Sequence, residues 1–189
     1  METQKTLPEN YKLIFEIDLL KNKKQMLAVN IAAVVIMLAM AVIGNFIVPA
    51  WHMYEGGLLY AKLLTLCIGY IAYILLHELV HGIFMKHYSG IKPKYGFTLL
   101  YAYAGSEAYF SKNAYIIIAL APVVIWGAVL GVLCAVLPAG WFWVAYFIQI
   151  GNISGAAGDA YVTYKMLTLP KDILVNDTGV AMTVYAKDE

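Results

Sequence analysis

The residues best suited to chemistry are the two histidines and the glutamate of the run HELVH at residues 77–81. In a helix, at 100° per residue, the two imidazoles lie about 40° apart on one face and one turn from each other. Both can then bind one metal ion, and imidazole nitrogen is a common zinc ligand. Glu78 flanks the first ligand, where a carboxylate can take a proton from water that a metal has made acidic. The spacing therefore predicts a zinc site with His77 and His81 as ligands and Glu78 as general base.

A third ligand is expected from another segment, because catalytic zinc typically has three protein ligands. Asp159 is the only acidic residue in the other long apolar segments. It lies six residues before Lys165, and the centre of HELVH lies seven before Lys86, so both sites are about 9 to 11 Å along their helices from the cytoplasmic end. Glycines around Asp159 allow close helix approach. Asp159 is thus the expected third ligand, and Glu107 is the alternative.

Other roles for these polar residues also require consideration. Hydrogen bonds to neighbouring helices could satisfy HELVH, but three such groups in an apolar helix are costly without a ligand. A bis-histidine haem needs imidazoles from facing helices, which an i, i+4 pair does not supply by itself. For Asp159 the alternative is pairing with Lys165 or solvent. A metal site remains the favoured interpretation.

The composition predicts that the site lies in a lipid bilayer. Hydrophobic residues make up 62% of the 189 positions and charged residues only 13%, well outside the range of soluble domains. A spanning helix needs about 20 mostly apolar residues, and four segments are long enough: 26–51, 58–84, 114–137 and 141–167. The expected fold is an all-α integral membrane protein, a single domain over 1–189 with four transmembrane helices.

The lysines predict the orientation in the membrane. They cluster before the first predicted helix and between the second and third, whereas the connections 52–57 and 138–140 contain none. The positive-inside rule then places both termini in the cytoplasm of a multi-pass protein of the cell membrane. Lys62, near the outer end of the second helix, is expected to extend its amine to the interface.

Residues 88–113 connect the second and third predicted helices. They contain Gly, Pro and alternating Tyr and small residues, which is typical of an extended hairpin. Such backbone enters a membrane only where protein or water satisfies its polar groups, so we expect a re-entrant or interfacial hairpin. Its edge is a candidate for pairing with an extended substrate. The segment 172–189 alternates weakly and is expected to add a short strand.

Nucleic acid is not an expected partner, because a net charge of +1 provides no basic field. Cys67 and Cys134 lie in separate apolar stretches, without the close spacing of a redox pair or a structural zinc site. The expected partners are the lipid bilayer and a membrane protein or peptide substrate. Neither the identity of the substrate nor the oligomeric state is encoded in any pattern of the sequence.

The order of these features resembles the site-2 protease family of intramembrane metalloproteases. HELVH stands in one apolar helix, a hairpin and a helix follow, and a later helix carries Asn152 and then Asp159. The chain is most similar to a group of small membrane zincins of uncharacterised function. Over 58–167 the resemblance implies a three-helix core in which His77, His81 and Asp159 bind zinc. It also implies Glu78 as base and Asn152 as a substrate-positioning residue. The run NISGAAGDA departs from the family pattern, which has prolines after the Asn and Gly after the Asp.

These features predict a zinc-dependent intramembrane endopeptidase that cleaves membrane-associated substrates near the cytoplasmic face. The alternative is a non-catalytic metal transporter or sensor with the same ligands. Transporters often contain paired repeats and broken helices, and the sequence has no visible repeat. A third hypothesis is an inactive partner protein that has kept the fold.

Overall fold

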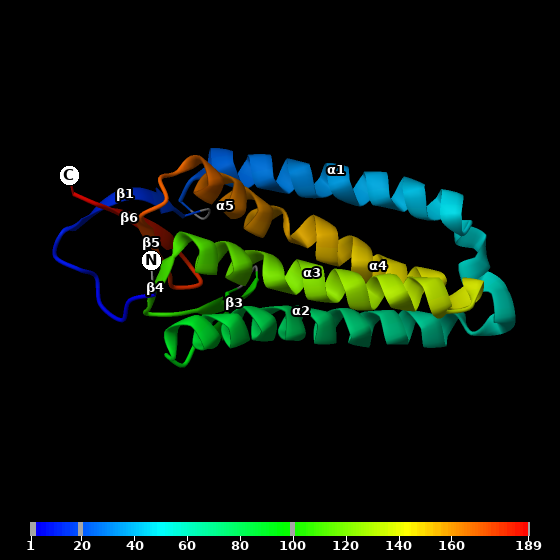
Figure 1. The fold of residues 1–189 in the computed structure, drawn as a ribbon. Coiled ribbons are helices and arrows are strands. Elements are labelled where there is room, and N and C mark those ends of the chain that lie inside the picture. Colours follow the sequence, from blue (N-terminus) through cyan, green and yellow to red (C-terminus); the bar gives the residue numbers. More distant parts are fainter. Residues whose placement is uncertain (1–2, 19–20, 99–100, 189) are drawn as a thin grey trace. The chain divides into compact units, whose positions relative to one another are not determined.

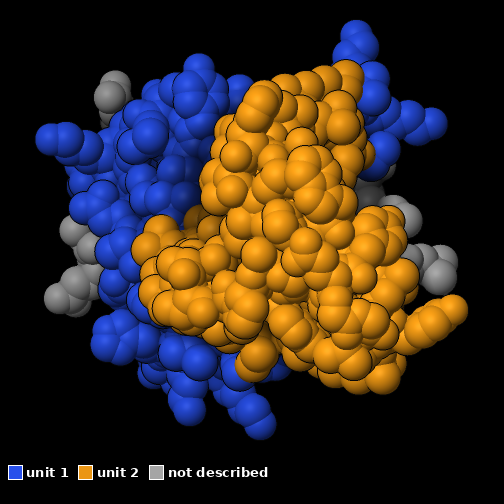
Figure 2. Space-filling view, turned by 90° about the vertical axis from the view of Figure 1, so that its right-hand side faces the viewer, with its two compact units in different colours: residues 1–27, 78–122, 159–189 blue, residues 28–77, 123–158 orange. Residues whose placement is uncertain are grey.

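The computed structural model describes residues 3–18, 21–98 and 101–188. Its elements, labelled in Figure 1, are β1 (Tyr11–Ile17), α1 (Lys23–Ile47), the 3-10 helix η1 (Ala50–Gly57), α2 (Leu59–Ser89), β2 (Lys94–Phe97), β3 (Ala102–Gly105), β4 (Tyr109–Ser111), α3 (Lys112–Val136), α4 (Ala139–Gly155), α5 (Ala157–Thr168), β5 (Ile173–Asp177) and β6 (Met182–Lys187). The chain divides into two compact units, coloured in Figure 2: residues 1–27, 78–122 and 159–189 form unit 1, and residues 28–77 and 123–158 form unit 2.

Three helices, α1, α2 and α3, are long and apolar enough to cross a membrane. The most apolar part of α1 buries none of its residues inside the protein, so its side chains need an apolar solvent such as lipid. The 31 residues of α2 rise about 46 Å, which exceeds the roughly 30 Å of a bilayer's hydrocarbon core. These helices indicate a membrane protein.

The predicted fourth helix, 141–167, is two helices. α4 has 17 residues and α5 has 12, and the helix breaks at Ala156. Glycines at 151, 155 and 158 surround the break, and glycine costs about 1 kcal/mol relative to alanine in a helix. Within the described residues only α1, α2 and α3 qualify as candidate spans, so the four-span count is not confirmed.

A β-sheet is present, which corrects the all-α prediction. Its four strands are antiparallel, in the order β1-β6-β5-β4, and they belong to unit 1. The segment 172–189 therefore forms two strands rather than one. Apolar side chains of the strands are buried in one cluster together with residues from the helix ends of the same unit. This cluster includes Phe110, Met166, Ile173, Val175 and Val184. Burial of this apolar surface stabilises the sheet.

The hairpin predicted within 88–113 is present as the antiparallel pair β2 and β3, in which Lys94 lies opposite Gly105 and Phe97 opposite Ala102. The Thr98 N–H donates to the Tyr101 carbonyl at 2.8 Å and closes the turn, while residues 99–100 lie outside the described residues. After the hairpin, β4 joins the larger sheet. A re-entrant position of the hairpin is not confirmed.

Aromatic side chains of α4 form much of the core of unit 2. Phe142, Trp143 and Tyr146 are buried together with Ile150. A Cβ at Gly44 of α1 would lie 2.2 Å from the Tyr146 ring, so only glycine fits at this approach.

Lys62 is buried within the protein, and the extension of its amine to the membrane interface stays a prediction. Its side chain is 1% exposed, and its Nζ donates to the carbonyls of Met53 at 2.9 Å and Glu55 at 2.7 Å. Glu55 has non-helical backbone angles inside η1, so its carbonyl has no regular helical partner. The ammonium group satisfies these carbonyls within unit 2, as buried polar groups require.

Candidate metal centre

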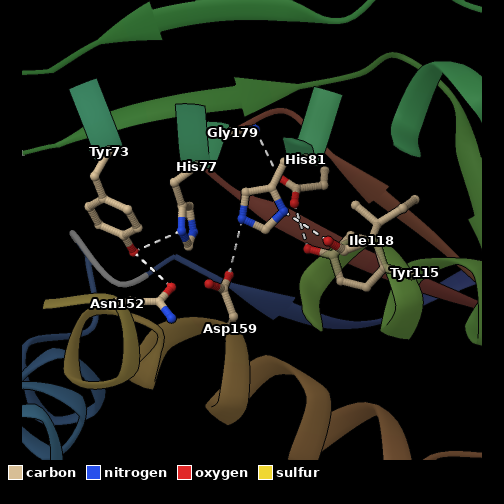
Figure 3. A network of polar contacts seen from close by, with 9 residues as sticks. Tyr73, His77, His81, Tyr115, Ile118, Asn152, Asp159 and Gly179 are labelled. Carbon is tan, nitrogen blue, oxygen red and sulfur yellow. Dashed lines mark hydrogen bonds and ion pairs between the residues drawn. The ribbon is translucent and has the colours of Figure 1, made fainter. Parts of the chain in front are cut away.

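The three predicted ligands offer atoms that all lie within 4.8 Å of one another. His77 and His81 stand one turn apart on the continuous helix α2, and Asp159 lies in the first turn of α5 (Figure 3). The His81 Nε2 is 3.8 Å from the Asp159 Oδ1. Zinc at about 2.0 to 2.1 Å from each ligand would hold tetrahedral ligand atoms roughly 3.3 Å apart. Small side-chain rotations would therefore bring these atoms around one ion.

A main-chain carbonyl holds the ring of His81. The Nδ1 atom of this buried side chain donates to the Ile118 carbonyl of α3 at 2.9 Å. A carbonyl oxygen only accepts hydrogen bonds, so Nδ1 must carry the proton. The neutral ring then presents the Nε2 lone pair toward Asp159. In zinc proteins, histidine ligands are oriented in the same way, by a hydrogen bond from the other ring nitrogen to a carbonyl or carboxylate.

A chain of side-chain hydrogen bonds holds the ring of His77. The Asn152 Nδ2 donates to the Val123 carbonyl at 3.2 Å and to the Gln149 Oε1 at 3.4 Å. This fixes the orientation of the amide, so that Asn152 Oδ1 accepts from the Tyr73 hydroxyl at 3.1 Å. With its hydrogen used there, the Tyr73 oxygen accepts from His77 Nδ1 at 3.0 Å (Figure 3). Nε2 is therefore the nitrogen through which His77 would bind a metal.

Asn152, which the family resemblance implies as a substrate-positioning residue, is 0% exposed. Its amide bonds to Tyr73, Gln149 and the Val123 carbonyl. Contact between Asn152 and substrate stays a prediction. The hydrogen bonds that it makes support the ring of His77 instead.

Glu78, the predicted base, lies beside the hairpin. Its carboxylate accepts a hydrogen bond from the main-chain N–H of Ala104 in β3, and His81 and Asp159 lie within electrostatic reach of it. An N–H donor fixes a carboxylate in one orientation and leaves lone pairs for further protons. The structure thus keeps Glu78 close to two predicted ligands.

Gly82 follows HELVH directly and lets the hairpin approach α2. A Cβ at this position would overlap the Tyr95 hydroxyl of β2, so a larger residue would displace the Tyr95 side chain. Burial raises the pKa of Tyr95, and the nearby Glu78 carboxylate raises it further. Tyr95 is therefore a protonated hydroxyl close to the base, and no motif in the sequence marks it.

Tyr115 and Asp177 form a second polar pair within unit 1. The Tyr115 hydroxyl donates to Asp177 Oδ2 at 2.5 Å, and the Gly179 N–H donates to Oδ1 at 2.8 Å (Figure 3). Burial raises the pKa of Asp177, although these two hydrogen bonds act in the opposite direction. Neither residue belongs to a recognisable motif, so the sequence offered no signal for them.

Glu107, the alternative third ligand, lies on the surface. Its Oε1 is 2.5 Å from the Lys94 Nζ, and both side chains are more than 70% exposed. The bond to Lys94 lowers the pKa of Glu107. The structure places Asp159, and not Glu107, in the group with His77 and His81.

A sequence signal existed for Tyr73 but was missed. Tyr73, His77 and His81 recur every four residues, which aligns them on one helix face. The Ala104 N–H and the Ile118 carbonyl are main-chain groups, so no residue type marks them in a sequence.

Comparison with known proteins adds one match. A family model described as putative zincin peptidase matches residues 70–174, more than half of the chain. The matched range includes HELVH, Asn152 and Asp159. No curated protein and no solved structure was found to match the chain.

Proposed function

This chain belongs to the family of putative zincin peptidases, and on that premise we propose that it is a zinc-dependent intramembrane endopeptidase of the HExxH type, similar to site-2 proteases. Family membership supports zinc metallopeptidase activity. The proposal goes further in assigning His77, His81 and Asp159 as ligands and Glu78 as general base, and in placing the reaction within or beside a membrane.

The observation that carries this proposal is the grouping of the three ligand atoms within 4.8 Å. Both histidines have their Nδ1 atoms committed to hydrogen bonds, so each offers Nε2. Two neutral imidazoles and one carboxylate, as in known catalytic zinc sites, leave a fourth position open for water or substrate.

The chemistry of the reaction divides between metal and protein. Zinc, when bound, polarises the scissile carbonyl and lowers the pKa of a water molecule toward about 7. The Glu78 carboxylate, oriented by the Ala104 N–H, takes the proton from the attacking water and delivers it to the leaving amine. Asp159 adds negative charge near His81, which favours binding of a cation.

The substrate class is proposed from the membrane helices and the hairpin. Three apolar helices support a site in a cell membrane, and the lysine distribution supports cytoplasmic termini and a site near the cytoplasmic face. The β2–β3 pair, with Ala104 bonded to Glu78, is a template on which an extended peptide could add a strand beside the base. A membrane protein or peptide with an unwound segment fits these features.

The test compares zinc content and peptide cleavage in the detergent-purified full chain. The probe is a defined mixture of synthetic transmembrane peptides in micelles, with products identified by mass spectrometry. Glu78→Gln is expected to keep one zinc per chain and to lower cleavage about 10²- to 10⁴-fold. Glu107→Gln, a carboxylate paired on the surface, is the matched control and keeps both properties.

Two results would contradict the proposal. Wild-type chain without bound transition metal after native extraction would remove the metal site. Zinc binding without cleavage, together with zinc uptake into proteoliposomes that contain the protein, would favour the transporter or sensor.

A further inference from the structure

Pro122 lies inside α3, and its side chain is among the most deeply buried in the protein. Proline has no main-chain N–H, and its ring clashes with the carbonyl four residues earlier. In α3 that carbonyl belongs to Ile118. The Ile118 carbonyl therefore lacks its normal α-helical donor.

The same carbonyl accepts the Nδ1 proton of His81 at 2.9 Å. A buried carbonyl without a partner is costly, and so is a buried ring N–H. The two groups satisfy each other. Any residue other than proline at position 122 would bring a main-chain N–H to the Ile118 oxygen, and His81 would then have to share this acceptor.

We infer that Pro122 is a positioning residue of the zinc site. By withholding a main-chain N–H, it leaves the Ile118 carbonyl to His81, and this hydrogen bond holds the imidazole in the tautomer that presents Nε2 to the metal. The inference rests on the proposed zinc site and adds to it a residue that lies in neither the HELVH motif nor the ligand set.

The test separates the missing N–H from the proline ring. Pro122→Ala restores the N–H, whereas lactic acid incorporated at position 122 forms a backbone ester that has neither N–H nor ring. Zinc affinity is measured by competition with a chelator on the full chain in detergent. The tautomer of His81 is measured in the metal-free protein by ¹⁵N NMR, with the four histidines assigned by single substitutions.

Pro122→Ala is expected to lower zinc affinity about tenfold to hundredfold, the range found when a partner of a metal ligand is lost. It should also produce a mixture of His81 tautomers. The ester variant is expected to bind zinc as wild type does, with Nδ1 protonated. Pro138→Ala, a proline that precedes α4, is the control and should leave both readouts unchanged.

Several outcomes would overturn the inference. Wild-type zinc affinity and an unchanged His81 tautomer in Pro122→Ala would do so while the proposed function stands. An ester variant as weak as Pro122→Ala would show that the ring acts instead of the missing N–H. If Pro122→Ala does not fold, the ester variant decides alone, since a tenfold loss there overturns the inference and wild-type affinity supports it. A wild-type chain that binds no zinc would overturn the proposed function and this inference together.

Discussion

His77 and His81 are one helical turn apart on α2, yet their Nδ1 atoms have partners of different kinds. His81 donates directly to the Ile118 carbonyl, and every group in that contact belongs to unit 1. His77 donates to the Tyr73 hydroxyl, which donates to Asn152, which donates to the Val123 carbonyl, all in unit 2. Each chain of hydrogen bonds ends on a main-chain carbonyl of α3.

The difference lies in how each tautomer is determined. A carbonyl accepts only, so one hydrogen bond is enough to place the proton on His81 Nδ1. A hydroxyl both donates and accepts, so Tyr73 places the proton on His77 only while Asn152 takes the hydroxyl hydrogen. The hydrogen bonds that support His77 can therefore be removed by side-chain substitutions at Tyr73 or Asn152. The acceptor of the His81 N–H is a main-chain carbonyl, which no side-chain substitution removes. The Pro122 test therefore includes a change of the backbone, the ester.

Tyr73→Phe is expected to have the largest effect in this comparison. It removes the acceptor of the His77 N–H and leaves Asn152 Oδ1 without its donor, while the aromatic ring is retained. Zinc affinity should fall about tenfold to hundredfold, as measured by chelator competition. Tyr70→Phe, a tyrosine on the same helix, is the control. Equal zinc affinity for wild type and Tyr73→Phe would contradict this account, since His77 would then bind zinc without the hydrogen bond to Tyr73.

Asn152→Ala is expected to have a smaller effect on zinc and a larger one on stability. The Tyr73 hydroxyl can still accept from His77, so zinc affinity should fall only severalfold. The Val123 carbonyl and the Tyr73 hydroxyl lose a buried partner, which costs about 1 to 3 kcal/mol of unfolding free energy. Zinc titration and thermal unfolding in detergent measure the two effects.

The same variant tests the role in substrate binding implied by the family resemblance. If Asn152 positions substrate, Asn152→Ala raises KM or lowers kcat at saturating zinc while zinc affinity and the His77 tautomer stay as in wild type. That result would assign Asn152 to the substrate and remove it from the His77 support.

Glu107→Gln is expected to have the smallest effect. The carboxylate has its pKa lowered by Lys94, so its contribution to stability is present above the pKa of the unfolded chain and is lost as the pH falls through the lower, folded value. Because both side chains are solvated, that contribution is weak. Zinc affinity and the melting temperature at neutral pH should match wild type. A tenfold loss of zinc affinity would instead make Glu107 a ligand.

The site residues that the sequence predicted rest on local geometry. The i, i+4 spacing places His77 and His81 on one face of any helix. The depth of Asp159 along its helix follows from counting the residues between it and Lys165. The Ala104 N–H and the Ile118 carbonyl could not be predicted in this way. Every residue has a main-chain carbonyl and every residue except proline an N–H, and only the tertiary structure shows which of them meets a given side chain.

The fold shows the same limit. The three apolar helices were predicted because about 20 apolar residues in a row are a local signal. The sheet was missed because β1 pairs with β6, so that Tyr11 lies opposite Lys187, and such distant pairing leaves little trace in either strand. The two carbonyls of η1 that bind the Lys62 amine could not be predicted, because nothing in the sequence marks them.

Zinc K-edge X-ray absorption of the purified wild-type chain tests the central claim most directly, because it identifies the ligands of the bound ion. The account predicts one zinc per chain with two imidazole ligands, nitrogen and oxygen donors only, and one oxygen donor fewer or loss of the ion in Asp159→Ala. A sulfur ligand, which would come from Cys67 or Cys134, or a spectrum unchanged by Asp159→Ala would contradict it.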